Sequence, residues 1–378
     1  MKITILVPSL EGGGAERVVS LLAGEWAGMG HEVCIVTLVS EASDAYDVSF
    51  DVKRAVIGYV QDSNSAVGGM IANGKRVRAL RRLLVAAKPD VVIGMMSSSS
   101  ILARLATAGT GALTIACERI YPPTMSISWW WRVLRRLLYP RTHLVIAQTH
   151  KGAQWLAEHC PGSRVAVIAN PILWPLPGTG KHGPSVQQVK EGRRIILAAG
   201  RLDRQKGFDL LIGAFAKIAS QFEAWDLVIL GEGPDREVLE AQVSAAGLAC
   251  RIRLPGFASN IRDWYQQAGL FVLSSRFEGF PNVLAEAMAH ACPSVSFDCD
   301  TGPGELIKSG VNGVLVDPET GAEGLALAME ELLDDAPLRL RLGAAAQEVR
   351  ERFALPLIAR QWEQTLIELC RSRQKFRV

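Results

Sequence analysis

The order of apolar and polar positions predicts two successive domains built on parallel sheets. Short apolar runs at residues 3–7, 33–38, 91–95 and 144–147 alternate with longer segments whose apolar residues recur at helical spacing. A strand followed by a helix, repeated several times, is typical of a parallel sheet with helices on its faces. The same alternation restarts after residue 192, with strands predicted at 195–199, 227–230, 252–254, 270–274, 294–297 and 314–316.

The segment between the two series is rich in Pro and Gly and has no periodicity, which is typical of a linker. We therefore expect a first domain over residues 1–174, a linker over 175–192 and a second domain over 193–353. Residues 354–378 form a predicted C-terminal helix that crosses back to the first domain. The predicted fold class is α/β, with two Rossmann-like, doubly wound domains that face each other across a cleft at the carboxyl ends of their strands.

Composition restricts the function and the compartment. The 378 residues include 41 Lys+Arg and 38 Asp+Glu, but the first 178 residues carry a formal charge of +6 and the remainder −3. Neither half is basic enough for a nucleic-acid-binding domain. The seven cysteines are scattered without a C-x-x-C pair, which indicates reduced thiols and not disulfides or a zinc site. No signal peptide and no apolar run of about 18 residues is present, so we expect a cytoplasmic protein with at most peripheral membrane contact.

Three glycines follow the first predicted strand and precede a helix. Gly12, Gly13 and Gly14 place backbone amides at a helix N-terminus, where phosphates bind. Arg17 stands where the dinucleotide fingerprint requires its third glycine, which disfavours a nicotinamide site. A tight turn without a ligand remains the alternative. The P-loop-like residues 178–181 lack a first glycine, a following Ser or Thr and a preceding strand, and we reject a phosphate site there.

The second domain opens with two cations in a loop after its first strand. Gly200 and Arg201 end this strand, and Lys206 precedes the next helix. A guanidinium fork and a mobile ammonium suit the charge of a diphosphate leaving group. Two solvated loop charges are the alternative interpretation.

Two carboxylates follow a later strand at a spacing of eight residues. Glu278 lies in the turn after the strand, and Glu286 lies in the helix that Pro281 initiates, on the same face as Asn282. Glu286 is surrounded by apolar residues, where a carboxylate costs stability unless it has a partner. A binding site is favoured over a solvated pair, although the latter stays open.

Together with the run Val-Asn-Gly-Val-Leu-Val at 311–316, these motifs resemble the family 4 retaining glycosyltransferases of GT-B fold, in the branch that acts on exopolysaccharides and lipid-linked oligosaccharides. The resemblance implies sugar transfer from a nucleotide-diphospho-sugar, preferably a UDP-sugar, with no metal and no other cofactor. It assigns catalytic roles to Arg201 and Lys206, which hold the diphosphate, and to Glu278, which positions the donor sugar. It assigns ribose binding to Glu286. The remaining donor-binding positions that it implies are Gly13, Gly14, Gly200, Gly279, Phe280, Pro281, Asn282, Val283 and Leu284.

A second motif, Asp298-Cys299-Asp300, matches the D-x-D metal signature of another glycosyltransferase class. It lies after the glutamate pair, outside the context in which that signature binds metal, and we do not expect a metal there. The following residues 301–305 are predicted to form a turn near the donor.

The positive charge of the first half falls in two patches. Lys75, Arg78 and Arg82 line one face of a predicted helix that ends before Lys88, and a solvated basic face is the alternative. The second patch has the composition of an interfacial amphipathic segment and consists of Trp129, Trp130, Trp131, Arg132, Arg135 and Arg136. Glu118, at the end of a predicted strand between the patches, could bind an acceptor hydroxyl, accept a proton or pair with Arg119.

These patches lead to a hypothesis about the acceptor. It is a polyprenyl-diphosphate-linked glycan at the anionic inner face of the cytoplasmic membrane, with its diphosphate bound by the basic helix. The chain would transfer a hexose or an N-acetylhexosamine to it. Two rival functions stay open at this point: a nucleotide-sugar epimerase of GT-B fold, and a non-catalytic subunit of a membrane glycan-assembly complex.

Overall fold

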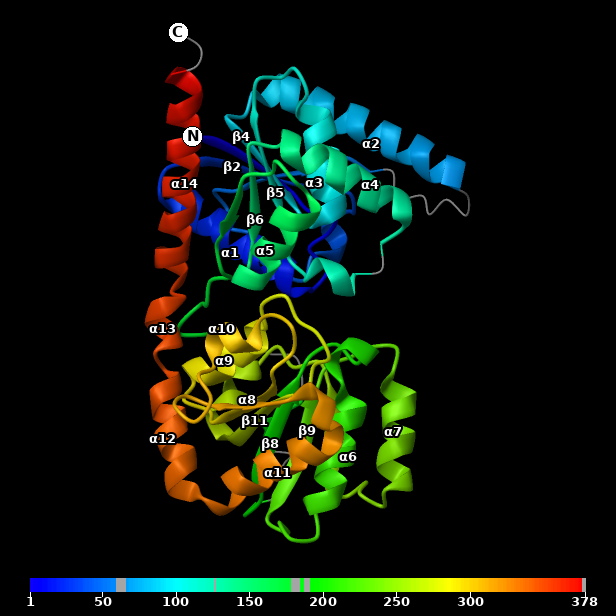
Figure 1. The fold of residues 1–378 in the computed structure, drawn as a ribbon, viewed down its shortest axis with the longest axis vertical. Coiled ribbons are helices and arrows are strands. Elements are labelled where there is room, and N and C mark those ends of the chain that lie inside the picture. Colours follow the sequence, from blue (N-terminus) through cyan, green and yellow to red (C-terminus); the bar gives the residue numbers. More distant parts are fainter. Residues whose placement is uncertain (59–65, 126, 178–183, 187–190, 376–378) are drawn as a thin grey trace. The chain divides into compact units, whose positions relative to one another are not determined.

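The computed structural model describes residues 1–58, 66–125, 127–177, 184–186 and 191–375 (Figure 1), without the side chains of 66, 67, 374 and 375. The chain divides into two compact units. Unit 1 comprises Met1–Pro171 together with Leu355–Val378, and unit 2 comprises Ile172–Ala354. Each unit contains one fully parallel sheet, which confirms the predicted α/β class with two parallel-sheet domains.

Unit 1 is built on a seven-stranded sheet with the order β3-β2-β1-β4-β5-β6-β7. All residues of β4 and β5 are buried, as expected for central strands that helices cover on both faces. Two short outer strands, β3 and β7, are only partly buried and lack a continuous apolar run. The strands of this sheet are β1 (Lys2–Leu6), β2 (Glu32–Thr37), β3 (Lys53–Val56), β4 (Val91–Met95), β5 (Leu113–Cys117), β6 (Leu144–Ala147) and β7 (Val165–Val167).

The helices of unit 1 are α1 (Gly14–Gly28), α2 (Ala66–Ala87), α3 (Ser97–Thr107), α4 (Trp129–Leu138), α5 (His150–His159) and α14 (Leu355–Lys375). Helix α2 buries Leu80 and Leu84 against α3 and the sheet, with Val77 and Leu83 partly buried beside them. It ends at Ala87, so the predicted basic helix that ends before Lys88 is confirmed.

The C-terminal helix α14 belongs to unit 1. The indole of Trp362 meets that of Trp26 on α1 edge to face, with ring centroids 5.8 Å apart. The Nε1 of Trp26 donates to the carbonyl of Ala359 at 3.2 Å, and a ring nitrogen of His31 lies 2.8 Å from a carboxylate oxygen of Glu363. Both indoles are fully buried, so the first and last helices of the chain share one core.

Unit 2 is built on a six-stranded sheet with the order β10-β9-β8-β11-β12-β13. Its strands are β8 (Arg194–Ala199), β9 (Trp225–Leu230), β10 (Ile252–Gly256), β11 (Ala268–Leu273), β12 (Ser294–Phe297) and β13 (Val314–Val316). Its helices are α6 (Phe208–Ile218), α7 (Arg236–Ala245), α8 (Ile261–Gln267), α9 (Asn282–Ala289), α10 (Pro303–Leu306), α11 (Gly321–Asp334), α12 (Ala336–Ala346) and α13 (Val349–Arg352).

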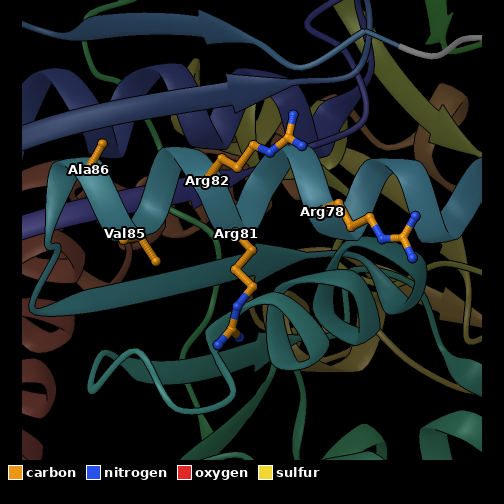
Figure 2. Close-up of a pocket in the computed structure, with 5 residues that line it drawn as sticks. All are labelled: Arg78, Arg81, Arg82, Val85 and Ala86. Atoms are coloured by element: carbon orange, nitrogen blue, oxygen red, sulfur yellow. The ribbon is translucent and has the colours of Figure 1, made fainter.

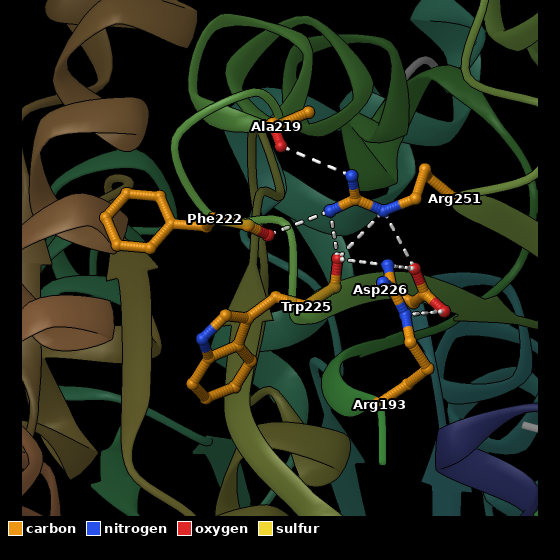
Figure 3. A network of polar contacts seen from close by, with 6 residues as sticks. All are labelled: Arg193, Ala219, Phe222, Trp225, Asp226 and Arg251. Atoms are coloured by element: carbon orange, nitrogen blue, oxygen red, sulfur yellow. Dashed lines mark hydrogen bonds and ion pairs between the residues drawn. The ribbon is translucent and has the colours of Figure 1, made fainter. Parts of the chain in front are cut away.

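A network of polar side chains lies at the amino ends of the strands of unit 2 (Figure 3). The buried carboxylate of Asp226 accepts hydrogen bonds from Arg193 and Arg251, and Arg251 also donates to the carbonyls of Ala219 and Phe222. The two guanidiniums compensate the buried negative charge of Asp226, and Arg251 also supplies hydrogen bonds to carbonyl groups at the end of α6. This network lies at the opposite end of the strands from the candidate site, and its role is structural.

The described part of the predicted linker packs onto unit 2. Leu176 and Val186 are buried, and the Nε1 of Trp264 donates to the carbonyl of Pro184 at 3.2 Å. The guanidinium of Arg350 lies 3.8 Å from the ring centroid of Trp174. The rejected P-loop string at 178–181 lies outside the described residues.

Candidate functional site

The candidate site of unit 2 lies at the carboxyl edge of its sheet. Because all six strands are parallel, the segments that follow β8, β9, β11 and β12 emerge at this one edge. Arg201 follows β8, Glu278 follows β11, and residues 298–302 follow β12. The fold therefore collects residues that are far apart in the sequence.

Lys206 and Glu278 form an ion pair at this edge. The Nζ of Lys206 lies 2.6 Å from Oε1 of Glu278, and the hydroxyl of Ser275 donates to the same oxygen at 2.7 Å. Both side chains are largely buried. Oε2 of Glu278 receives no hydrogen bond from the described residues, so it can accept one from a ligand.

Three further contacts fix the loop of Lys206 to the loop of Glu278. Arg276 binds Asp209 through two parallel hydrogen bonds of 2.8 and 2.6 Å, and its backbone amide donates to the carbonyl of Gln205. The side chain of Gln205 donates back to the carbonyl of Phe277 at 3.0 Å. Hydrogen bonding to Arg276 lowers the pKa of Asp209. The two loops therefore behave as one preorganised element.

Arg201 is an exposed cation in the loop after β8. Its side chain is 72 % exposed, with its Nε 3.7 Å from a carboxylate oxygen of Asp203. Its loop packs tightly against the turn after β9. A Cβ added at Gly231 would lie 1.9 Å from the carbonyl oxygen of Gly200. A Cβ added at Gly233 would lie 2.3 Å from the carbonyl oxygen of Leu202. Only glycine fits at these two positions.

Glu286 is buried on α9 and has a partner in α8. The hydroxyl of Tyr265 donates to Oε2 of Glu286 at 3.2 Å. Helix α9 begins directly after the Gly279–Pro281 turn and has no acidic residue in its first turn. Its N-terminal dipole, at Asn282 and Val283, thus points to the same edge and favours an anion.

The turn after β12 packs on the glutamate loop, near the predicted donor positions. Thr301 donates to the backbone carbonyl of Glu278. Gly302 adopts φ +101°, and a Cβ there would lie 2.8 Å from Cδ of Pro281. Asp298 and Asp300 are exposed, while Cys299 is buried. Among the residues that the structure describes, no group of three or more His, Cys, Asp or Glu is arranged to hold a metal ion.

In unit 1, Glu118 is buried in a polar cluster at the end of β5. The hydroxyl of Ser97 donates to its carboxylate at 2.7 Å, that of Tyr139 donates to Oε1 at 2.5 Å, and an Arg135 nitrogen lies 3.7 Å from Oε1. Burial raises the pKa of Glu118, and Arg135 opposes this. The ion pair with Arg119 that the sequence left open is wrong, because the partner of Glu118 is Arg135.

The structure divides the predicted interfacial segment between the core and the surface. Trp131 packs against the core of unit 1 and stacks on Trp130, whereas Trp129 is 70 % exposed. The interpretation of Arg135 as a lipid-facing cation is wrong: it is buried beside Glu118, with its guanidinium 4.8 Å from the ring centroid of Trp155. The exposed residues of α4 are Trp129, Arg132, Val133, Arg136 and Leu137, at helical spacing.

Arginines on α2 line an open cavity of about 420 Å³ (Figure 2). Its lining consists of Arg78, Arg81, Arg82, Val85 and Ala86. Arg81 points away from the other two arginines and donates to the carbonyls of Ala106 and Ala108. Arg78 and Arg82 are exposed and make no hydrogen bond or ion pair with the described residues, and Lys75 is exposed one turn before Arg78. These three cations face solvent and are available to a ligand.

The glycine turn of unit 1 places its backbone at the N-terminus of α1. Gly13 is the residue before the helix and Gly14 its first residue. The carboxylate of Glu16 lies over this turn. A Cβ added at Gly13 would lie 2.1 Å from Oε2 of Glu16.

Among the described residues, no helix combines the length and the apolarity that a membrane span requires.

Comparison with known families now identifies the chain. The family model for Glycosyltransferase Family 4 matches residues 12–172, and the model for Glycosyl transferases group 1 matches residues 184–349. The lipopolysaccharide core biosynthesis glycosyltransferase LpsE of Rhizobium meliloti is 33 % identical over 265 residues, which cover 69 % of this chain and 70 % of LpsE.

The chain is a family 4 glycosyltransferase.

Other relatives of this glycosyltransferase differ in length. An α-1,4-N-acetyl-D-galactosaminyltransferase of Campylobacter jejuni, whose name specifies a diphospho-undecaprenol-linked substrate, is 27 % identical over 98 % of this chain and 99 % of its own. The exopolysaccharide phosphotransferase of Streptomyces coelicolor is 33 % identical over 62 % of this chain. This chain covers 24 % of that relative's length.

Solved structures show the GT-B fold of this glycosyltransferase. A sucrose-phosphate synthase from Thermosynechococcus elongatus superposes with a TM-score of 0.81 at 19 % identity, over 98 % of this chain and 99 % of the other. HepE of Anabaena, in complex with UDP-glucose, superposes with a TM-score of 0.78 at 20 % identity, over 97 % and 100 % of the two chains.

Several residues of the candidate site in this glycosyltransferase were not anticipated from the sequence alone. Ser275, Thr301 and Tyr265 hold the two glutamates, but single hydroxyls carry no spacing signal. Gly231 and Gly233 were detectable, because the string Gly-Glu-Gly directly follows a predicted strand at the carboxyl edge. Arg119 was noted only as a neighbour of Glu118.

Proposed function

We propose that this glycosyltransferase is a retaining enzyme that transfers a hexose or an N-acetylhexosamine from a UDP-sugar to a polyprenyl-diphosphate-linked glycan. The observation that carries the proposal is the Lys206–Glu278 pair beside the exposed Arg201, at the N-terminus of α9. Two cations and a helix N-terminus at one edge suit a diphosphate leaving group. The UDP-glucose bound to HepE supports the choice of donor.

The roles of the residues follow from their contacts. Lys206 and Arg201 stabilise the charge that develops on the departing diphosphate, while the acceptor hydroxyl attacks from the same face of the sugar. In this proposal Glu278 positions the donor and is not a nucleophile, and its Oε1 is held by Lys206 and Ser275. Its Oε2 accepts a hydrogen bond from a sugar hydroxyl. Glu286, oriented by Tyr265, binds the ribose hydroxyls.

We propose that the reaction needs no metal and no other cofactor. The diphosphate carries negative charge that Arg201, Lys206 and the dipole of α9 can neutralise together. Asp298 and Asp300 flank a buried cysteine and face solvent, and in this proposal they have no catalytic role. Transfer measured with and without a chelator tests this point directly.

The acceptor proposal rests on unit 1. The exposed Lys75, Arg78 and Arg82 on α2 suit a diphosphate group, and the diphospho-undecaprenol in the name of the Campylobacter relative supports such an acceptor. On α4, the exposed Trp129, Val133 and Leu137 recur every four residues, with Arg132 and Arg136 beside them. This face suits the anionic inner surface of the cytoplasmic membrane.

A two-stage experiment tests the proposed function. First, thermal unfolding is measured with a panel of UDP-, GDP- and ADP-sugars, and UDP-sugars are expected to raise the Tm most because ligands that bind the folded state stabilise it. Second, the best donor is incubated with a synthetic polyprenyl-diphosphate glycan, and the anomeric configuration of the product is determined by NMR. Inversion of configuration, a GDP- or ADP-sugar preference, or epimerisation of the donor without transfer would each contradict the proposal.

A further inference from the structure

Arg119 is a buried cation whose side chain has no hydrogen-bond partner among the described residues. Arg119 is 6 % exposed. Its Nε, Nη1 and Nη2 atoms are all buried and make no hydrogen bond to the described residues. Guanidinium groups remain charged in proteins and carry five N–H donors. A buried charge without a partner is strongly unfavourable, so it indicates that a partner is supplied from outside the chain.

The neighbours of Arg119 do not compensate its charge. The carboxylate of Glu118 is bound by Ser97, Tyr139 and Arg135. Burial raises the pKa of Cys117 to about 12, so its thiol is neutral at physiological pH. The negative charge of Glu16 acts on Arg119 electrostatically, but the two side chains form no ion pair. Burial lowers the pKa of Arg119, and the charge of Glu16 opposes this shift. The carboxylate of Glu16 is therefore a countercharge that does not contact the guanidinium of Arg119.

Two independent features meet at this place in unit 1. Arg119 follows β5, and the glycine turn that begins α1 follows β1, so both lie at the carboxyl edge of the same parallel sheet. Glu16 connects them, because its carboxylate lies over Gly13 and interacts electrostatically with Arg119. The 15-residue helix α1 adds its positive dipole end to the charge of the guanidinium.

We propose that Arg119 and the N-terminus of α1 form an anion site that binds a diphosphate oxygen of a substrate. The inference rests on the proposed function, in which the donor and the acceptor both carry a diphosphate. None of the residues of this site belongs to the basic face of α2. Arg119 is in this proposal a binding residue, retained at a cost to the stability of the free protein.

The substitution Arg119→Met tests the site. It keeps the length and the apolar stem but removes the charge, so the ligand-free variant is expected to have an unchanged or higher Tm. Binding of farnesyl diphosphate and of UDP is then measured by calorimetry. The Kd of one of the two diphosphates is expected to rise about 10- to 100-fold, the loss typical of a hydrogen bond to a charged group. The ligand affected identifies the acceptor or the donor as the source, and Arg119→Lys is expected to recover part of the affinity.

A matched control is Arg339→Met in unit 2. Arg339 is also buried, but it donates to the carbonyls of Leu332 and Leu333. Its replacement is expected to lower the Tm and to leave both Kd values unchanged. The proposal is overturned if Arg119→Met binds both diphosphates as the wild type does, if its loss of affinity is matched by Arg339→Met, or if the wild type binds neither. Sugar transfer by the wild type, measured in parallel, reports on the proposed function separately.

Discussion

Lys206 and Glu278 are 72 residues apart in the chain and 2.6 Å apart in the structure. One residue comes from the loop after β8 and the other from the loop after β11, strands that pair side by side. The cation proposed to hold the diphosphate is therefore positioned by the carboxylate proposed to hold the sugar. Such preorganisation lowers the cost of reorganisation during the reaction.

Separate and combined replacement of these two residues distinguishes stability from catalysis. Lys206→Met leaves the carboxylate of Glu278 buried with Ser275 alone and is expected to lower the free energy of unfolding by about 3 kcal/mol. The double variant Lys206→Met/Glu278→Gln is expected to recover most of that stability but no transferase activity. Urea unfolding and a radiolabelled transfer assay measure the two effects. Equal destabilisation in the single and double variants would show that the pair is not coupled.

Arg201 is expected to act on the rate and not on the fold, because its side chain is mostly exposed. Arg201→Ala should lower kcat about 10²–10³-fold, the usual loss when one group that stabilises developing charge is removed. Its Tm should stay close to the wild-type value. Arg204→Ala is the matched control, since it removes an exposed arginine from the same loop. Turnover near the wild-type value in Arg201→Ala would rule out the proposed role.

The Asp209–Arg276 pair predicts a pH dependence of stability. Arg276 lowers the pKa of Asp209 in the folded state, so the pair contributes stability above the unfolded pKa of about 3.9. This contribution is lost as the pH falls through the lower folded pKa. Asp209→Asn should therefore unfold at lower urea than the wild type at pH 7, with the difference shrinking below about pH 4. A difference between Asp209→Asn and the wild type that stays constant over this pH range would contradict the assignment.

The basic face of α2 predicts a selective effect on the acceptor. Arg78→Ala/Arg82→Ala should raise the KM for the polyprenyl-diphosphate glycan far more than the KM for the donor, because both side chains are free to bind a ligand and belong to unit 1. Arg164→Ala, an exposed arginine elsewhere in unit 1, serves as the charge control. Steady-state kinetics with each substrate varied in turn measures the split. Equal increases in both KM values would refute the interpretation.

The exposed face of α4 predicts binding to anionic vesicles. Trp129→Ser/Leu137→Ser should weaken sedimentation with phosphatidylglycerol vesicles by at least about tenfold, since the apolar area available for burial is reduced. Leu327→Ser/Leu340→Ser, two exposed leucines of unit 2, is the matched control and should bind as the wild type does. Unchanged vesicle binding in the α4 variant would exclude this face as the contact.

The sequence pattern was sufficient for the repeated strand–helix order, because central parallel strands are continuous apolar runs. It could not predict β3 or β7, whose few half-buried residues leave no such run. Within the candidate site, Arg201, Lys206 and Glu278 could be proposed because they follow predicted strands, and Glu286 because of its spacing from Glu278. The direction of each side chain was not. Arg135 and Arg136 are neighbours in one basic segment, yet one lies in the core and the other faces solvent.

The environment of Glu118 shows why such directions need tertiary structure. Its partners Ser97, Tyr139 and Arg135 come from α3, the turn after α4 and α4 itself. Arg135 and Tyr139 lie one helical turn apart, but no local spacing relates them to Ser97 or to Glu118. Its chain neighbour Arg119 was an option as its ion-pair partner. Because successive residues of an extended chain point in opposite directions, Arg119 does not reach this cluster, and it makes no side-chain hydrogen bond with the described residues.

The contact between Trp26 and Trp362 has a consequence for the order of folding during synthesis. Unit 2 is a single stretch of chain and can fold as soon as it leaves the ribosome. Unit 1 begins earlier, yet its core around Trp26 stays open to water until α14 has been made. The half of the protein that is translated first is therefore the half that is completed last.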